Sequence, residues 1–385
     1  MAPISDGRTR RRLIVKKPGG WLLLITLVLC PVMSRAADKP ASQPISVRFL
    51  FQPQVQFTEK DAPDADSWGK EAFIRRARII VAGAVSDRIS FFAETDVPNW
   101  GKNGNWTGSL CIQDAYIDYL LVKDGGFINN LHLAAGLILL PFSHNERQTV
   151  ATLNTLDFHG AVIQFPTGST KVWRDNGLEA RGLFWNKHLD IRIGVFNGLR
   201  GNAADARPVN AKDSPRFTGR VQYNFLDAEE GFFYGGNYLG AKKILSIGAG
   251  LDTMADYRAT TLDLFVDYPL RSDLGLVFQA DYFHYSPEPE RLGPGFDAPN
   301  GRAYDLEAGL RYKNLEPVFS YERFNPENAA LRPMDFAENL RFGLNWWIMG
   351  HTANLKAEYA RLKTRDALSA DKTRGQWTLQ AQVFY

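Results

Sequence analysis

Residues 216–225 read RFTGRVQYNF, with a polar side chain at every even position and an apolar residue or Gly at every odd one. A period of two over about ten residues is the pattern of a β-strand with one polar and one apolar face. The pattern recurs at 188–197, 303–312 and 375–385. No stretch of comparable length has the 3.6-residue apolar spacing of an amphipathic helix. The sequence therefore predicts an all-β protein.

The length of these segments and the charge on their polar faces favour a transmembrane barrel. Strands of about ten residues cross a bilayer when tilted, whereas strands in soluble sandwiches are usually about five or six residues long. The polar faces carry charged and amide side chains, as expected of a wet lumen. A soluble exported β-sandwich binding protein is the alternative, because its strands alternate too. Such a protein would be recovered without detergent.

Seventeen segments alternate in this way. They are residues 45–57, 72–84, 89–97, 111–122, 130–140, 159–165, 178–186, 188–197, 215–226, 243–252, 258–268, 274–285, 303–312, 315–324, 337–348, 352–362 and 375–385. A single-chain bacterial barrel has an even number of strands, with short periplasmic turns and long external loops. Short turns can be assigned to the periplasmic side by counting strands from the N-terminus or from the C-terminus. The two counts agree only if 159–165 is not a spanning strand. We therefore predict an antiparallel barrel of sixteen strands, with 141–177 as its third external loop.

Aromatic residues support this assignment. Seven of them lie on apolar faces within a few residues of an end assigned to the periplasm: Tyr119, Tyr223, Phe225, Tyr268, Tyr312, Trp346 and Tyr385. Such a girdle is expected where rings meet lipid headgroups. Residues 227–242 fit less well, because this segment is assigned to a periplasmic turn although it is sixteen residues long. The sequence pattern predicts no role for it.

The first 36 residues have the pattern of a cleaved signal peptide. A basic stretch at 8–17 precedes the apolar run 21–33, WLLLITLVLCPVM, and small residues at 34 and 36 precede the expected cleavage point. This order indicates a secretory signal peptide rather than a spanning helix or an amphipathic surface helix. Residues 37–385 would then form the barrel, exported to the outer membrane of a Gram-negative cell.

The positive charge of the chain comes largely from this leader. The full sequence has 45 Lys and Arg against 42 Asp and Glu. Without residues 1–36 the balance is 38 against 41, a net charge of −3. This removes the main argument for a nucleic-acid partner. Only Cys111 remains of the two cysteines, so no intrachain disulfide is expected.

Several motifs resemble the phosphate-selective porin O and P family. They are IRRAR (74–78), SDRISF (86–91), IQDAYIDY (112–119), LPFS (140–143), GVFNG (194–198), RFTGRVQYNF (216–225), NWWIMGH (345–351) and NLK (354–356). The resemblance covers nearly all of the mature chain and implies a trimeric, water-filled, sixteen-stranded barrel in outer-membrane lipid. It also implies an anion path lined by arginines and lysines and constricted by the third loop. The last strand, which ends at Tyr385, resembles the signal read by the outer-membrane assembly machinery.

Side chains on the polar faces are the candidates for the pore wall. The basic ones are Arg76, Arg78, Arg192, Arg216, Arg220 and Arg341, with Arg311 and Lys356 in addition. In the third loop the candidates for a constriction are His144, Arg147, Lys171 and Arg174, unless that loop is simply exposed. Arg76 and Arg78 are the densest pair; they form either an ion site or a solvated pair bound to nearby acids. Eight basic wall residues against twelve acidic ones weaken the case for anions, although charge at the narrowest ring decides selectivity.

Signals for catalysis are weak. The six histidines show no metal-ligand spacing, and the sequence contains no phosphate loop or nucleophile elbow. We therefore predict no enzymatic activity, no cofactor and no metal. The predicted function is passive diffusion of small hydrophilic solutes, with anions such as phosphate as candidates. A general or weakly cation-preferring porin is the alternative that the acid excess leaves open.

Overall fold

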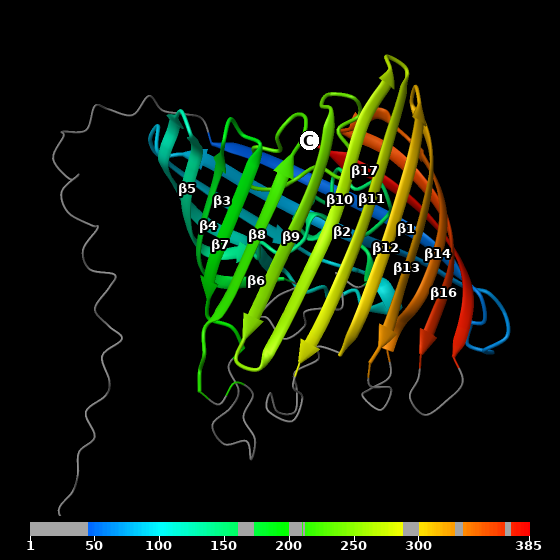
Figure 1. Ribbon diagram of the computed structural model, residues 1–385. Coiled ribbons are helices and arrows are strands. Elements are labelled where there is room, and N and C mark those ends of the chain that lie inside the picture. Colours follow the sequence, from blue (N-terminus) through cyan, green and yellow to red (C-terminus); the bar gives the residue numbers. More distant parts are fainter. Residues whose placement is uncertain are drawn as a thin grey trace, which may run out of the picture. The chain divides into compact units, whose positions relative to one another are not determined.

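The computed structural model describes residues 45–160, 173–199, 210, 212–287, 300–327, 334–365 and 371–385. These residues form a closed antiparallel barrel (Figure 1). The predicted signal peptide, residues 1–36, lies outside the described residues, as does Lys171. Within the described ranges, no helix is long and apolar enough to span a membrane.

Sixteen long strands make the wall. They are β1 (Ser46–Thr58), β2 (Gly69–Ala84), β3 (Ile89–Asp96), β4 (Cys111–Gly125), β5 (Ile128–Leu139), β6 (Arg174–Phe184), β7 (Leu189–Phe196), β8 (Arg216–Asn224), β9 (Ile244–Met254), β10 (Tyr257–Arg271), β11 (Leu274–Pro287), β12 (Gly301–Tyr312), β13 (Leu315–Pro326), β14 (Met334–Trp346), β16 (Ala353–Arg365) and β17 (Lys372–Phe384). Each pairs with its neighbours along the chain, and β1 pairs with β17 to close the ring. A short strand, β15 (Ile348–His351), lies in the β14–β16 connection and outside the ring order. The prediction of sixteen strands is confirmed, and β5 pairs directly with β6, without a strand at 159–165 between them.

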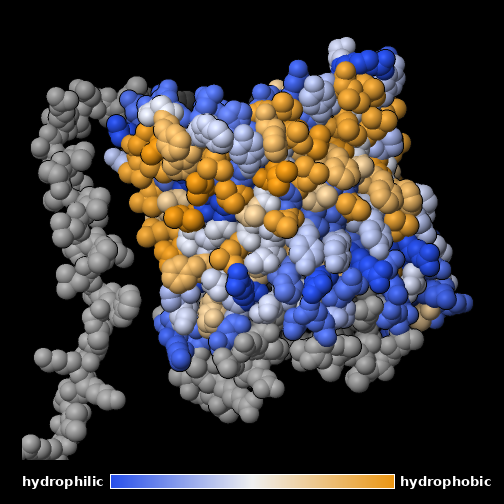
Figure 2. Space-filling view, in the orientation of Figure 1, coloured by the Kyte–Doolittle hydropathy of each residue, from blue (hydrophilic) through white to orange (hydrophobic). Residues whose placement is uncertain are grey.

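The wall reverses the burial pattern of a soluble protein. On β8, Arg216 and Arg220 are buried toward the lumen, whereas Phe217 is 52% exposed on the outside. Figure 2 shows apolar residues gathered in a band across the visible wall. An exposed apolar surface of this extent is stable only against an apolar surrounding such as lipid. The closed ring contradicts the alternative of a soluble β-sandwich, which consists of two separate sheets.

The two ends of the barrel differ in their connections. The terminal rim is the end at which β1 begins and β17 ends, and the loop rim is the opposite end. Most terminal-rim connections have between two and six residues, and most loop-rim connections are longer. The predicted girdle residues Tyr312 and Trp346 are half exposed on the outer face near the terminal rim.

Two connections depart from the predicted pattern of short turns at one rim and long loops at the other. At the loop rim, residues 255–256 are the whole connection between β9 and β10. At the terminal rim, 225–243 is a long connection between β8 and β9. Its central part, residues 227–242, is named the inner segment here because of its position in the barrel.

The described part of the third loop, residues 140–160, folds into the lumen, where Gln148 contacts Gln279 on the wall. Residues 174–177, predicted as the end of this loop, belong to β6, which begins at Arg174. Within the loop, the single-turn helix α1 (His144–Arg147) begins where the Ser143 Oγ accepts a hydrogen bond from the Glu146 N–H at 3.0 Å. The loop lies so close to the wall that a Cβ on Gly250 would be 1.9 Å from the Phe142 carbonyl oxygen. Only Gly permits this approach.

The inner segment enters the lumen from the terminal rim and binds the third loop. The Tyr234 N–H donates to the Arg147 carbonyl at 2.9 Å, and the Tyr234 carbonyl accepts from the Thr149 N–H at 3.0 Å. The Gly236 N–H donates to Thr152 Oγ1 at 3.0 Å. The inner segment is therefore longer than a turn because it extends into the barrel and contacts the third loop there.

Candidate solute pathway

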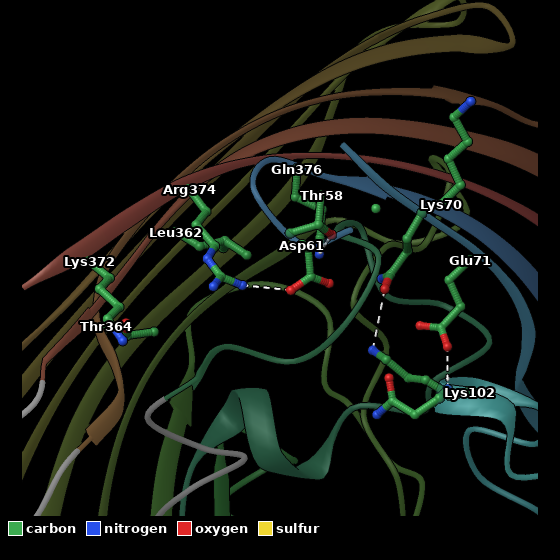
Figure 3. Close-up of a pocket in the computed structure, with 13 residues that line it drawn as sticks. Thr58, Asp61, Lys70, Glu71, Lys102, Leu362, Thr364, Lys372, Arg374 and Gln376 are labelled. Atoms are coloured by element: carbon green, nitrogen blue, oxygen red, sulfur yellow. Dashed lines mark hydrogen bonds and ion pairs between the residues drawn. The ribbon is translucent and has the colours of Figure 1, made fainter. Parts of the chain in front are cut away.

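Two cavities lie along β1 and β2. The mouth cavity, about 510 Å³, lies toward the loop rim and is lined by Gln56, Thr58, Asp61, Gly69, Lys70, Glu71, Lys102, Asn103, Leu362, Thr364, Lys372, Arg374 and Gln376. Figure 3 shows Arg374 directed at Asp61, with 2.6 Å between Nη1 and Oδ1, and Lys70 pointing away from them. The inner cavity, about 530 Å³, lies toward the terminal rim. It is lined by Ser46, Arg48, Arg78, Ile80, Ala82, Phe92, Glu94, Gln148, Thr149, Val150, Thr152, Phe158, Arg174, Phe233 and Phe384.

A layer of polar side chains lies between the two cavities. Its wall residues are Gln52 and Gln54 on β1 with Arg76 on β2, and the third loop supplies Asp157. The Arg76 Nη1 donates to Gln52 Oε1 at 3.0 Å, and the Arg76 Nη2 forms an ion pair with Asp157. We name this set, together with Arg75, the arginine layer.

Arg75 joins the arginine layer through a β-bulge. In the β1–β2 register Gln52 pairs with Arg76 and Pro53 with Ile74, so Arg75 is the extra residue. Its Nη2 lies 2.6 Å from Asp157 Oδ2. Burial opposes ionisation of Asp157, but the charges of Arg75 and Arg76 outweigh it and hold the pKa of Asp157 well below its usual range. Strict alternation places Arg75 outside the barrel, and Pro53, which has no N–H for the ladder, is the sequence signal for the bulge.

All six predicted pore-wall arginines face the lumen, and each lies in an ion pair. Their partners are Asp157 for Arg76, Glu94 and Asp96 for Arg78, Asp190 for Arg192, Asp252 for Arg216, Asp263 for Arg220, and Glu322 with Glu358 for Arg341. Arg76 is in the arginine layer and Arg78 lines the inner cavity. The other four line neither cavity. Arg192, for example, is covered by the inner segment, with Nη1 donating to the Phe232 carbonyl at 2.7 Å.

His144 and Arg147 anchor the third loop. The His144 Nε2 lies 2.9 Å from Glu229 Oε2, and the Arg147 Nη1 lies 2.9 Å from Glu179 Oε2. Arg147 also donates to the Phe232 carbonyl at 2.6 Å. Both side chains are fully buried, and neither lines the mouth cavity or the inner cavity.

Of the remaining third-loop candidates, the structure describes Arg174. It is the first residue of β6, forms an ion pair with Asp114 at 3.0 Å and lines the inner cavity. Lys171 lies outside the described residues.

A row of glutamines follows the seam between β1 and β17. The Gln52 Nε2 donates to Gln382 Oε1 and the Gln54 Nε2 to Gln380 Oε1, both at 2.7 Å. Gln56 continues the row into the mouth cavity. A search for charged residues does not find these side chains, but the spacing QPQVQ at 52–56 and QAQ at 380–382 marks them.

The two cavities are richer in cations than the whole lumen wall. Their basic lining residues are Lys70, Lys102, Lys372 and Arg374 at the mouth, with Arg48, Arg78 and Arg174 inside. Their acidic lining residues are Asp61, Glu71 and Glu94. The local balance is therefore seven cations against three acids, opposite in sign to the predicted wall total. Many wall acids, such as Asp281 and Asp305, are buried away from both cavities.

The buried Glu146 makes the protein sensitive to pH. Its Oε1 has no hydrogen-bond partner within the described residues, and burial together with the charge of Asp252 raises the pKa of Glu146 to about 8. In the unfolded chain a Glu titrates near about 4.3. Between about pH 4.3 and 8 the folded state therefore holds a proton that the unfolded state releases, and the free energy of unfolding falls as the pH rises through this range.

We expect Glu146→Gln to raise the unfolding temperature at about pH 8 and to leave it unchanged below about pH 4.3. The measurement is thermal unfolding in detergent followed by circular dichroism. Asp87→Asn, at an exposed turn residue, is the matched control and should leave the pH dependence unchanged. The same pH dependence in Glu146→Gln and in the wild type would contradict the assignment.

Comparison with known proteins supports the fold but not a specific family. No protein-family model matches the sequence, and no curated protein matches it. The chain is similar to three solved structures. They are the outer membrane channel DcaP of Acinetobacter baumannii (14% identity, TM-score 0.55, 90% of this chain and 98% of that chain), an anion-selective porin from Comamonas acidovorans (12%, 0.58, 89% and 100%) and Salmonella typhi OmpF in complex with daunomycin (13%, 0.56, 89% and 98%). At this identity the likeness shows a common barrel fold, and the resemblance to the O and P family is not confirmed.

Proposed function

We propose that this chain is an outer-membrane porin through which small hydrophilic solutes diffuse passively, with a preference for anions. The observation that carries the proposal is the lining of the two cavities, with seven cations against three acids. Arg75 and Arg76 in the arginine layer add two cations against Asp157 at the point between the cavities. Charge along the path that a solute follows determines selectivity, whatever the total charge of the wall.

The exposed apolar band supports a location in lipid, and the shared fold with an outer membrane channel and an anion-selective porin supports the outer membrane. Export by a signal peptide at residues 1–36, insertion by the outer-membrane assembly machinery and assembly into a homotrimer belong to the same proposal. So does the assignment of the loop rim to the cell exterior.

The contacts suggest how an anion would pass. At the mouth it meets Lys102, whose Nζ lies 3.3 Å from Gln56 Oε1 and 4.7 Å from the Phe73 ring centroid. At the arginine layer, guanidinium and amide N–H groups replace part of its hydration shell. Asp157 offsets one of the two arginine charges there. The layer therefore attracts an anion without binding it tightly, as conduction requires.

Phosphate is one anion that fits this chemistry, because guanidinium groups bind phosphate oxygens in pairs. A general or weakly cation-preferring porin is the second candidate. It is favoured by the buried acids on β10 to β13, which would dominate if solutes passed along that side of the lumen.

Planar-bilayer recording tests the proposal. Purified, folded protein should produce stable single-channel steps in KCl without any energy source. Addition of phosphate to a chloride-conducting channel should lower the chloride current if phosphate occupies the same path. The absence of stable conductance from folded protein would refute the porin function.

A further inference from the structure

Four acidic side chains form a continuous row across the inner wall. Asp263 on β10 pairs with Asp281 on β11, Asp281 pairs with Asp305 on β12, and Asp305 pairs with Glu322 on β13. Directly opposed residues on neighbouring strands have Cβ atoms about 5 Å apart, and like charges in this arrangement are destabilising. All four side chains are buried. The row is therefore stable only with bound protons or with positive charge nearby.

Among the described residues, arginines neutralise only the two ends of the row. Arg220 lies 2.5 Å from Asp263, and Arg341 lies 2.5 Å from Glu322. At the centre, Asp305 is 1% exposed, and neither of its carboxylate oxygens has a hydrogen-bond partner within the described residues. The Oδ1 of Asp281 is also unpartnered there. An unpartnered buried carboxylate is costly unless it is protonated or a cation compensates it.

The third loop places His159 over this centre. One ring nitrogen of His159 and one oxygen each of Asp305 and Glu322 all lie within 4.8 Å of one another. The His159 Nε2 is 3.4 Å from Glu307 Oε2, and its Nδ1 is 3.7 Å from Glu322 Oε2. If Nδ1 binds a metal beside Glu322, the Nε2 lies next to the carboxylate of Glu307, the kind of group that orients a metal-bound histidine.

Glu322 is held in place by other groups. It accepts hydrogen bonds from the Asn339 Nδ2 at 2.6 Å and from the Gly160 N–H, and it pairs with Arg341. Such support fixes a ligand carboxylate and its orientation. The Arg341 side chain, which pairs with Glu322, is 17% exposed.

We propose that His159, Asp305 and Glu322 bind one divalent transition-metal cation such as Zn²⁺. An imidazole nitrogen combined with carboxylate oxygens is a donor set for Zn²⁺ or Mn²⁺, whereas Ca²⁺ and Mg²⁺ prefer oxygen ligands alone. Small side-chain rotations bring the three donors to ligand distances of about 2 Å. The ion compensates the centre of the acidic row and ties the third loop to β12 and β13. This site is independent of the proposed porin function.

Isothermal titration of the full-length, detergent-folded protein with ZnCl₂, after dialysis against a chelator, tests the proposal. We expect about one ion per chain, and loss of this binding in both His159→Gln and Asp305→Asn. His132→Gln, a substitution of another histidine on the inner wall, is the matched control and should retain binding. Substitution by Co²⁺ provides a spectroscopic measure, since d–d absorption bands should appear in the wild type and be absent from both site variants.

Folding of each variant is checked by circular dichroism before titration. Failure of the folded wild type to bind Zn²⁺ would overturn the proposal without the need for any variant. Binding that persists in folded Asp305→Asn or His159→Gln would also overturn it, as would a site that accepts Ca²⁺ or Mg²⁺ but not Zn²⁺.

Discussion

Replacement of residues 228–242 by a two-residue Asn-Gly turn should raise the single-channel conductance several-fold. The inner segment fills part of the lumen with aromatic side chains, and Phe233 lines the inner cavity. The hairpin pairing of β8 and β9 continues to Asp227 and Lys243, where the Asp227 N–H donates to the Lys243 carbonyl at 2.9 Å. An Asn-Gly turn suits a hairpin closed at that point. Side chains that the segment covers, such as Arg192, would then face water.

The length-preserving variant Phe232→Ala/Phe233→Ala/Tyr234→Ala should give a smaller increase. Trp185→Ala removes an aromatic ring at the same rim but on the exposed outside, and should not change the conductance. Each variant is first tested for the faster migration of unboiled barrel on SDS gels. If the shortened variant folds and conducts like the wild type, the inner segment does not restrict the pathway.

The double variant Arg75→Ala/Arg76→Ala should shift the ion preference strongly toward cations. The wild-type arginine layer carries two guanidinium groups against Asp157, and the variant leaves the carboxylate alone. The local charge therefore changes from +1 to −1 between the two cavities, on the path proposed for permeating ions. Asp157→Asn should have the opposite effect and increase anion preference. Reversal potentials in a KCl gradient measure both.

Arg323→Ala provides the matched control, because Arg323 lies on the outer face of β13 and is exposed. Arg323→Ala removes positive charge from the protein, as the double variant does, but it does not change the proposed pathway. Equal shifts in Arg323→Ala and in the double variant would show that only the total charge matters. An unchanged reversal potential in Arg75→Ala/Arg76→Ala would show that ions bypass the arginine layer.

The wall of the barrel could be predicted from sequence because the side chain of each strand residue faces either the lumen or the lipid. On β8, for example, Arg220 faces the lumen and Val221 faces outward, so the alternation of polar and apolar residues in the sequence shows the orientation directly. The strand number followed from turn length. Alternation along β2 gave the wrong orientation for Arg75, because Arg75 lies at a β-bulge. The bulge depends on the partner strand β1, where Pro53 is its signal in the sequence.

The interior of the barrel was much harder to predict. The inner segment was clearly too long for a turn, but its position depends on contacts with residues far away in the chain, such as Tyr234 with Arg147. His159 and Asp305 are separated by more than a hundred residues, and only strand register and the fold of the third loop bring them together. The charge of the two cavity linings differs from the total charge of the wall, because many wall acids are buried away from both cavities.

The reversal potential of the wild-type channel in a steep KCl gradient tests the central claim most directly. A pathway lined by the cations of the mouth cavity, the arginine layer and the inner cavity predicts the sign that corresponds to chloride permeating faster than potassium. A reversal potential of the opposite sign, from folded protein with stable conductance, would contradict the proposed pathway and would favour the cation-preferring alternative.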